Sequence, residues 1–527
     1  LPMGTGDIST NPFLDDPDGW DNLLGGSDGA DDRFHLNLAM PSPGFDAGSA
    51  AASTFAFTDG STLADRTSRT DYVLDGSAPD SALVNMGYHY APTLPLLPDL
   101  SINDARVYYG VGNNPQPGVR TWNDLGSSWS AEGLAAPAGS TIRWTVHQVA
   151  PQLTQQQLLG VLSDSGSATK LNLLRWNGLA WSLDWSAGAI APGQSGKRGF
   201  DVAYEQTSGD ALVVYSNNTN TPRYRARTAG LWSAELALPV APLSGVVQWV
   251  QLSARPGNNE IGLAYSDANA DLAVLVWDGA TWTAATSSVL ETNLKTNAVT
   301  GAVSNRVFDL AYEASGELVV AWGRLGANGF RYSTKAAGSS AWTASNQVSQ
   351  ALSSVPHFVD LASEPGSDRL AIVVCGLGDG VERMGLAIWN GNNWINRDEV
   401  DSQITNANEA AIGDFPAAVA WVGTSGTAVC VYADDQAGTL DWAQWTGGGW
   451  AVQGDFAMPG KGITESVELK TFASGNRVML LFSDSNSDLF ALWTDGTSWN
   501  TTNGGLALTT SLSSISSVPF SFAIKPQ

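Results

Sequence analysis

The segment Trp277-Asp278-Gly279-Ala280-Thr281-Trp282 places two tryptophans five residues apart on either side of an Asp-Gly pair. Asp-Gly and Asn-Gly between aromatic strand ends are strong hairpin signals, because both turn residues are expected at positive φ. The arrangement recurs with Asn-Gly or Thr-Gly at three further places, which are Trp176 to Trp181, Trp389 to Trp394 and Trp445 to Trp450. Each of these units is therefore expected to close with a β-hairpin.

The second tryptophan of this pattern marks a repeat with intervals of about 50 residues. The eight marks are Trp129, Trp181, Trp232, Trp282, Trp342, Trp394, Trp450 and Trp499. Two further β-like runs precede the hairpin, as in residues 308–312 followed by 317–322. Four short strands per unit, without helical periodicity between them, are typical of a β-propeller blade. The regular spacing also favours a structural role for these tryptophans, as wedges between blades, over the stacking of sugars.

The two ends of the chain indicate how the ring closes. The first unit offers only three strands, at residues 106–110, at 119–122 and around Trp129, whereas residues 518–524 resemble the first strand of a blade without its successors. We therefore predict an all-β fold, an eight-bladed β-propeller over residues 102–527 that is closed by the C-terminal strand. The alternative is a pair of up-and-down β-sandwiches, which have no reason to keep eight equal repeats.

Composition excludes several classes of protein. The 527 residues include 26 Lys+Arg against 51 Asp+Glu, a net charge of -25, which argues against a nucleic-acid partner. No apolar run is long enough to predict a membrane span. The start Leu1-Pro2-Met3-Gly4 has neither an initiator methionine nor a signal peptide, so we expect a processed or trimmed chain. Cys375 and Cys430 lie in apolar runs and are expected to be buried thiols, with one disulfide as the alternative.

One position in the first strand of several blades carries an acidic or amide residue between apolar neighbours, as in Phe308-Asp309-Leu310. Since side chains alternate along a strand, these residues are expected to point into the central channel. The channel-lining candidates are Asp201, Gln251, Asp309, Asp360 and Glu468. They suggest a cation or a basic ligand on the axis. The alternative is a water-filled channel with hydrated walls.

The sequence 266–271, Ser-Asp-Ala-Asn-Ala-Asp, recurs as Ser-Asp-Ser-Asn-Ser-Asp at 483–488. Alternating Asp and Asn can ligate Ca²⁺, but here a strand follows at once and the acidic arm of a calcium loop is missing. We interpret both segments as hydrogen-bonded turns.

Residues 1–92 differ from the rest in being rich in Asp, Gly, Ser and Ala. Three ordered pieces, at 11–21, 31–48 and 65–90, carry the motifs Asn-Pro-Phe-Leu, Ser-Pro-Gly-Phe-Asp-Ala-Gly and Asn-Met-Gly-Tyr-His-Tyr. In this order they resemble the closing segment of secreted bacterial right-handed parallel β-helix repeat proteins, although the coils that should precede it are absent. The resemblance implies an irregular β-rich segment that contacts a neighbouring subunit or a missing upstream region. The Pro-rich residues 93–101 are expected to link it to the propeller.

The N-terminal segment also contains the best metal candidate in the sequence. Hard Ca²⁺ prefers several oxygen ligands from flexible loops. The proposed ligands are Asp16, Asp18, Asp21, Asp31 and Asp32. Calcium is the one cofactor predicted, and a solvated acidic loop is the alternative.

No catalytic constellation is found in the sequence, so no catalytic residue is assigned, although a carboxylate pair formed between blades stays open. We therefore predict a secreted or cell-surface, non-catalytic structural protein, whose propeller serves as a rigid module for binding partner proteins or for assembly into filaments. The alternative is a carbohydrate-binding or polysaccharide-cleaving protein that uses loops on one propeller face to contact an extracellular glycan.

Overall fold

The computed structural model divides the chain into two compact units, Leu1–Pro98 and Asp99–Gln527. In the first unit it describes only β1 (Leu14–Asp15) and β2 (His35–Leu36), which pair antiparallel. In the second it describes residues 104–527 except 140, 152–156, 166–167, 177–179, 189, 191–196, 241–242, 297–305, 379–380, 402–403, 405–414, 434–435, 459, 501–506, 515–516 and 526–527. The predicted linker and most of the β-helix-like segment therefore lie outside the described residues, and that resemblance stays a prediction.

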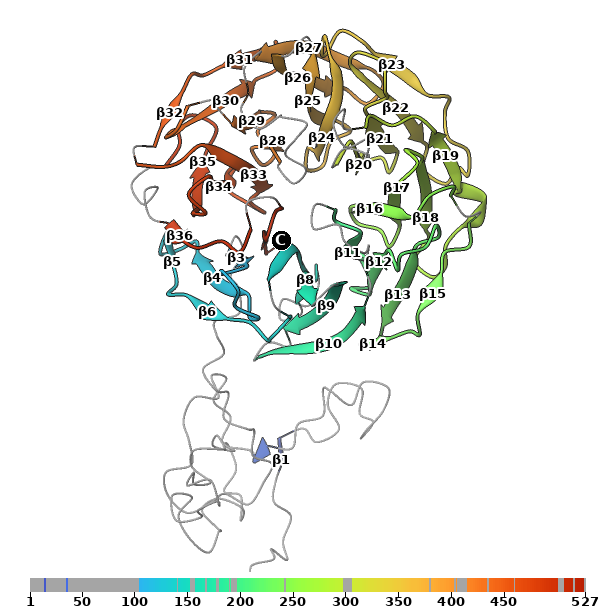
Figure 1. Cartoon of the computed structure of the whole chain (residues 1–527), viewed down its shortest axis with the longest axis vertical. Coiled ribbons are helices and arrows are strands. Elements are labelled where there is room, and N and C mark those ends of the chain that lie inside the picture. The colour runs from blue at the N-terminus through green and yellow to red at the C-terminus, as the bar shows by residue number, and fades with distance from the viewer. Residues whose placement is uncertain are drawn as a thin grey trace, which may run out of the picture. The chain divides into compact units, whose positions relative to one another are not determined.

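The second unit consists of eight antiparallel sheets arranged as blades around an axis (Figure 1). The first four blades contain the following strands. Blade 1 has β37 (Phe520–Ile524), β3 (Ala105–Tyr109), β4 (Gly118–Asn123), β5 (Ser128–Trp129) and β6 (Gly133–Leu134); blade 2 has β7 (Ile142–Val149), β8 (Gln157–Ser165), β9 (Ala168–Trp176) and β10 (Trp181–Gly188); blade 3 has β11 (Phe200–Tyr204), β12 (Ala211–Tyr215), β13 (Arg223–Thr228), β14 (Leu231–Trp232) and β15 (Leu236–Ala237); blade 4 has β16 (Val247–Ala254), β17 (Ile261–Asp267), β18 (Leu272–Trp277) and β19 (Ser288–Glu291).

The other four blades continue the ring. Blade 5 has β20 (Phe308–Tyr312), β21 (Leu318–Trp322), β22 (Phe330–Lys335) and β23 (Asn346–Val348); blade 6 has β24 (Val355–Ser363), β25 (Leu370–Gly378), β26 (Val381–Trp389) and β27 (Trp394–Asp401); blade 7 has β28 (Ala417–Trp421), β29 (Ala428–Ala433), β30 (Thr439–Trp445), β31 (Trp450–Val452) and β32 (Phe456–Ala457); blade 8 has β33 (Thr464–Thr471), β34 (Val478–Asp484), β35 (Leu489–Thr494) and β36 (Ala507–Thr509). The predicted eight-bladed all-β fold is confirmed.

The C-terminal strand β37 closes the ring. It pairs with β3 from Ala105↔Ile524 to Tyr109↔Phe520, and it forms the inner strand of blade 1. Figure 1 places the C-terminus near the centre of the ring, close to β3. Phe520 and Phe522 are almost fully buried, so the closing strand contributes apolar side chains to the core as well as backbone hydrogen bonds. The predicted closure by the C-terminal strand is confirmed; the outer strand of blade 1, predicted as one, is split into β5 and β6, which both pair with β4.

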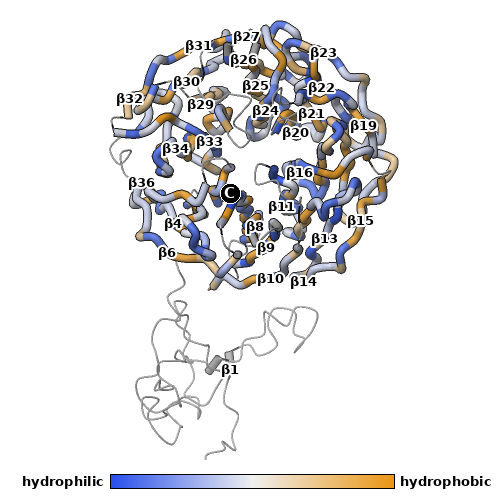
Figure 2. The backbone as a smooth tube through the Cα atoms, in the orientation of Figure 1, coloured by the Kyte–Doolittle hydropathy of each residue, from blue (hydrophilic) through white to orange (hydrophobic). Residues whose placement is uncertain are grey.

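Buried apolar strands explain why the blades stack. β12 and β29 are buried along their whole length, because each lies between neighbouring strands in its own sheet and is covered by adjacent blades on both faces. Such strands appear in the sequence as continuous apolar runs, such as Ala-Leu-Val-Val-Tyr at 211–215. Figure 2 shows hydrophobic stretches in every blade of the ring.

The tryptophan pairs lie across the third and fourth strands of their blades. Trp389 faces Trp394 in the ladder, with ring centroids 5.5 Å apart, and Trp277 and Trp282 form an isolated bridge. Both pairs are buried, as the predicted structural role requires. One detail of the prediction is wrong: Gly279 has φ +99°, but Asp278 does not adopt positive φ. The Asp278 carboxylate instead accepts hydrogen bonds from the backbone N–H groups of residues 280 and 281, so the connection is a longer, Asp-capped turn.

The blades alternate between two types. The inner strands β7, β16, β24 and β33 each contain a register shift near their first residues, whereas β11, β20, β28 and β37 pair without one. A bulge inserts one residue and redirects the side chains beside it. The propeller is therefore four copies of a two-blade unit, which the sequence period of about 50 residues does not reveal.

Other predictions concern smaller features. Cys375 and Cys430 are buried free thiols, as expected. Both repeated Asp-Asn segments are turns: Asp267 Oδ1 accepts hydrogen bonds from the backbone N–H of Asn269 and Asp271, and Asp484 does the same in blade 8. Within the described part of the chain, no helix is long and apolar enough to cross a membrane.

Candidate functional site

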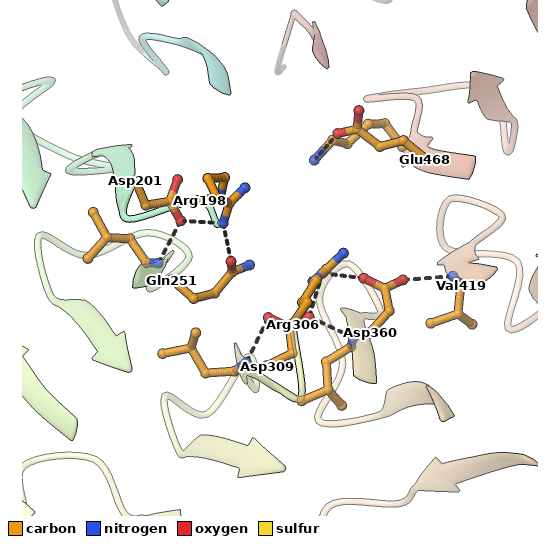
Figure 3. A network of polar contacts seen from close by, with 12 residues as sticks. Arg198, Asp201, Gln251, Arg306, Asp309, Asp360, Val419 and Glu468 are labelled. Carbon is orange, nitrogen blue, oxygen red and sulfur yellow. Dashed lines mark hydrogen bonds and ion pairs between the residues drawn. The ribbon is translucent and has the colours of Figure 1, made fainter. Parts of the chain in front are cut away.

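The five residues predicted to surround the axis all lie on inner strands. Asp201 is on β11, Gln251 on β16, Asp309 on β20, Asp360 on β24 and Glu468 on β33. Figure 3 shows them around the centre of the ring together with two arginines. Their arrangement decides which of them are available to a ligand.

The three aspartates link neighbouring blades. Oδ2 of Asp309 accepts a hydrogen bond of 2.9 Å from the backbone N–H of Leu361 in the next blade. Asp201 accepts one of 2.8 Å from Leu252, and Asp360 accepts one of 2.9 Å from Val419 (Figure 3). All three side chains are buried, so each carboxylate replaces a missing main-chain partner between two inner strands.

Two arginines that the sequence analysis did not select neutralise these carboxylates. Nη2 of Arg306 lies 2.7 Å from Asp309 Oδ2 and also pairs with Asp360. Arg198 occupies the equivalent place two blades earlier, pairing with Asp201 at 3.4 Å and donating a hydrogen bond to Gln251. The repeated motif Arg-x-Phe-Asp, at 198–201 and 306–309, is the sequence signal that could have found them.

Burial shifts the protonation of this network. It raises the pKa of Asp360 to about 6; the Arg306 guanidinium opposes the shift, and the neighbouring Asp309 carboxylate reinforces it. Burial likewise raises the pKa of Asp201 and of Glu468, against the opposing charges of Arg198 and Lys470 respectively. Lys470 lies 3.4 Å from Glu468 Oε1. The carboxylates are thus largely committed to protein partners, and the predicted cation or basic ligand on the axis stays a prediction.

Aromatic side chains fill the axis beside this network. Trp144 of blade 2 contacts Trp249 of blade 4 at 5.4 Å between ring centroids, and both rings contact Phe415, which precedes blade 7. Phe358 of blade 6 completes the cluster. Trp144, Trp249 and Phe358 each follow the bulge in their strand, which directs them inward. At this level the centre of the ring is a packed core of buried aromatic side chains.

The proposed calcium ligands Asp16, Asp18, Asp21, Asp31 and Asp32 lie outside the described residues. Among the described residues, no group of three or more His, Cys, Asp or Glu side chains is placed to hold a metal ion. The calcium site stays a prediction.

The seam between blades 8 and 1 contains an aromatic pocket. Its empty volume is about 310 Å³, part of which is open to solvent. Blade 1 contributes Trp122 and Trp129, whose ring centroids lie 5.5 Å apart, and blade 8 contributes Trp493. The remaining lining residues are Met479, Ala491, Leu492 and Asn500. Trp129 and Trp493 are half-buried, so parts of both rings reach solvent.

An ion pair spans the seam at one side of this pocket. Arg477 of blade 8 lies 2.6 Å from the Asp124 carboxylate of blade 1. The same carboxylate accepts a hydrogen bond of 3.2 Å from the indole N–H of Trp122, and the Arg477 guanidinium lies over the ring of Trp493. The two pocket walls are therefore held in fixed relative positions by charged groups.

A second charged side chain, that of Arg120, lies on β4, the strand that also carries Trp122. Arg120 and Trp122 are two residues apart on β4, so both side chains face blade 8 about 7 Å apart along the strand. Arg120 donates hydrogen bonds of 2.9 Å to the carbonyls of Leu508 and Ser130. Near it, the phenol of Tyr109 donates to Glu132, which is exposed. The seam thus combines aromatic faces, two guanidinium groups and two carboxylates with balanced charge.

This pocket could not be found from the sequence, because its two walls are at least 350 residues apart in the chain. A partial signal exists in the repeated tetrapeptide Trp-Ser-Ala-Glu, at 129–132 and 232–235. It marks the blades in which an exposed glutamate follows the outer tryptophan by three residues.

No protein-family model matches the sequence, and no curated protein matches it. Solved structures to which the chain is similar include the fucose-specific lectin from Aleuria aurantia, at 16% identity and a TM-score of 0.32, with 57% of this chain and 94% of the lectin covered. AofleA from Arthrobotrys oligospora is 13% identical, with a TM-score of 0.32 and coverage of 60% and 87%. The polysaccharide lyase Uly1 is 10% identical, with a TM-score of 0.37 and coverage of 63% and 85%. At such low identities and TM-scores, these likenesses carry no argument about what this chain binds.

Proposed function

We propose that the propeller binds carbohydrate, and that the pocket between blades 8 and 1 is a binding site for a neutral sugar. One observation carries the proposal: three tryptophans surround an open pocket that is bordered by hydrogen-bonding charged groups. This is the second of the two functions considered from the sequence. The proposed site lies in the seam between two blades, whereas the sequence-based hypothesis placed the glycan on loops of one propeller face.

The chemistry of the pocket matches a sugar ring. The C–H face of a pyranose packs well on an indole, and Trp129 and Trp493 offer partly exposed rings from opposite walls. Hydroxyl groups need nearby donors and acceptors. Asn500 lines the pocket itself, and Arg120 and Glu132 lie farther along the same seam. The pocket is shallow: its enclosed space is only about 20 Å³, so it would receive the edge of one sugar ring whose remainder stays in solvent.

The charge around the pocket favours a neutral ligand. Arg477 is paired with Asp124, and the exposed carboxylate of Glu132 lies near Arg120 through their shared neighbour Tyr109. No guanidinium here is in excess of its carboxylates, so an anionic sugar would gain little.

The assembly role predicted first from the sequence remains a second proposal, which no feature of the described seams favours. The secreted or cell-surface location is likewise proposed, and it agrees with an extracellular glycan as ligand. Binding, rather than cleavage, is the activity proposed for the seam.

Glycan-array screening of the full chain, followed by calorimetric titration of the best neutral oligosaccharide, tests the proposal. The Trp129→Ala and Trp493→Ala variants should each weaken binding at least 10-fold. Trp450→Ala is the matched control. Trp450 has the same place in the strand pairing of blade 7 as Trp129 has in blade 1, but it lies outside the pocket, so its substitution should leave the affinity unchanged. Thermal unfolding of each variant shows that the ring still folds. Absence of any glycan binding, or equal losses in all three variants, would contradict the proposal.

A further inference from the structure

The strand β13 concentrates positive charge in an acidic protein. Its sequence Arg223-Tyr224-Arg225-Ala226-Arg227 places an arginine at every second position, so that all three point to the same face of the sheet. That face is turned toward blade 2: the Arg225 guanidinium lies 5.1 Å from the ring centroid of Trp185 on β10. We call the surface formed by Arg223, Arg225, Glu235 and Trp185 the seam 2/3 cluster.

Two carboxylates face these arginines from the adjoining elements. Glu235 accepts a hydrogen bond of 2.6 Å from the phenol of Tyr215 and lies 4.0 Å from Nε of Arg223. Asp184 of blade 2 is bound by Arg175 at 3.0 Å and by the indole N–H of Trp232 at 2.8 Å. The three arginines of β13 and Arg175 thus contribute four positive charges, whereas Glu235 and Asp184 contribute two negative charges. The seam therefore has positive charge in excess.

The arginines retain hydrogen-bonding capacity toward a ligand. Arg225 donates one hydrogen bond, of 3.0 Å, to the carbonyl of Ser233. Nε of Arg223 and Nε of Arg225 are buried, so these two arginines can contact a ligand only through their terminal Nη groups. A guanidinium has five donors, and the Arg223 side chain is 32% exposed, so a ligand can reach it.

The seam 2/3 cluster repeats the frame of the pocket between blades 8 and 1. The strand pairings make Tyr215 of blade 3 equivalent to Tyr109 of blade 1, and Arg225 equivalent to Arg120. In the same alignment Glu235 is equivalent to Glu132. Two positions differ in chemistry. Arg223 replaces Gly118, and Arg227 replaces Trp122. The same scaffold thus carries balanced charge in one seam and excess positive charge in the other.

We propose that the seam 2/3 cluster is a second carbohydrate site, which binds an anionic sugar of an acidic polysaccharide. Arg223 and Arg225 bind its carboxylate or sulfate group, and Trp185 and Trp232 border the sugar ring. Guanidinium groups bind planar carboxylates in a bidentate manner, and a tetrahedral sulfate group can present two of its oxygens to the same pair of N–H donors. The assignment of a sugar as the ligand rests on the proposed function, whereas the selection of an anion rests on the arginines of β13.

Calorimetric titration of the full chain tests this inference. The probes are an oligogalacturonate, its methyl ester, a sulfated galactan oligosaccharide and an oligoglutamate. The oligogalacturonate or the sulfated oligosaccharide should bind, and which of them does identifies the anionic group. The methyl ester and the oligoglutamate should bind at least 10-fold more weakly.

Arg225→Gln and Arg223→Gln should each weaken anion binding at least 10-fold, because a charge-assisted contact is lost. Arg331→Gln is the matched control, since Arg331 holds the register of Arg223 in blade 5 and bonds to Ser345 and Gln347 instead. Thermal unfolding confirms that each variant folds. Unchanged affinity in both seam variants, or equal binding of the methyl ester or the peptide, would overturn the inference.

The pocket between blades 8 and 1 and the seam 2/3 cluster can be tested independently of each other. Trp129→Ala should abolish neutral binding and leave anionic binding intact, whereas Arg225→Gln should do the reverse. If the neutral sugar does not bind but the anionic one binds through Arg225, the site between blades 8 and 1 is refuted and the seam 2/3 site stands.

Discussion

The phenol of Tyr109 donates a hydrogen bond of 2.8 Å to Oε2 of Glu132, and thereby fixes an exposed carboxylate at the seam between blades 8 and 1. The same relation recurs two blades later between Tyr215 and Glu235. Burial of each tyrosine, together with the acceptor carboxylate, raises the pKa of its phenol, so both stay protonated donors. A buried tyrosine that orients a surface glutamate is a way to preset a polar ligand contact without exposing the core.

The aspartate links between inner strands should be essential to ring stability. Asp309→Ala removes the partner of Arg306 and leaves the backbone N–H groups of Leu310 and Leu361 unpaired in a buried place. We expect a loss of about 3 to 5 kcal/mol in the free energy of unfolding, measured by urea denaturation. Asp278→Ala, in an exposed hairpin turn, is the control and should cost about 1 kcal/mol. A loss for Asp309→Ala no larger than that of the control would refute the link.

A buried histidine makes the protein sensitive to acid. Burial lowers the pKa of His147 from 6.5 to about 3, the hydrogen bond to Gln157 opposes this, and the charge of Arg106 adds to it. The folded state therefore binds fewer protons than the unfolded chain between these values. The stabilisation is complete above about pH 6.5 and falls by about 1.4 kcal/mol per pH unit as the pH drops toward 3.

His147→Phe should flatten the pH dependence of the unfolding free energy between about pH 4 and 6. Both proteins are compared by urea denaturation at several pH values. If the slope is the same in the two proteins, the histidine is not the group that titrates.

Closure by the C-terminal strand can be tested by truncation. A chain that ends at Ser517 lacks β37, so the inner edge of blade 1 is exposed and Phe520 and Phe522 are lost from the core. We expect this chain to aggregate or to unfold at a much lower temperature, and a peptide of residues 518–527 to restore the melting point. A milder variant, Phe522→Ala, should cost about 3 to 5 kcal/mol. A truncated chain that melts like the full chain would show that the ring does not need β37.

Much of this fold could be predicted from the sequence because each blade carries local signals. The tryptophan pair around a turn, as at Trp389 and Trp394, is formed by residues near in the chain. Even the closure followed from local evidence, since residues 518–524 are a strand without successors. The two-blade alternation could not be predicted, because a bulge such as that between Ile142 and Trp144 leaves no composition signal.

The site was harder to predict than the fold. Channel candidates such as Asp309 were placed on the correct strands by side-chain alternation, but alternation does not tell whether a carboxylate faces open space or the N–H of Leu361. The partners of Trp129 and Arg225 belong to adjacent blades, so their pockets depend on how blades pack. Spacing in one chain carries no information on such contacts.

The predicted calcium site in the N-terminal segment is tested separately from the propeller. Replacing Asp16, Asp18, Asp21, Asp31 and Asp32 by asparagine in the full chain should abolish Ca²⁺ binding measured by calorimetry, because neutral amides hold a divalent cation poorly. Asp278→Asn, at an exposed aspartate of the propeller, serves as a single-site control and should leave Ca²⁺ binding unchanged. Absence of Ca²⁺ binding by the unmodified chain would refute the site.

A crystal structure of the full chain with the best neutral oligosaccharide from the array tests most directly whether the seam between blades 8 and 1 binds carbohydrate. We expect a sugar ring packed within about 4 Å of Trp129 or Trp493, with hydroxyl groups in hydrogen-bond distance of Arg120, Glu132 or Asn500. Density for the sugar on the axis or on a propeller face, with the seam between blades 8 and 1 empty, would contradict it.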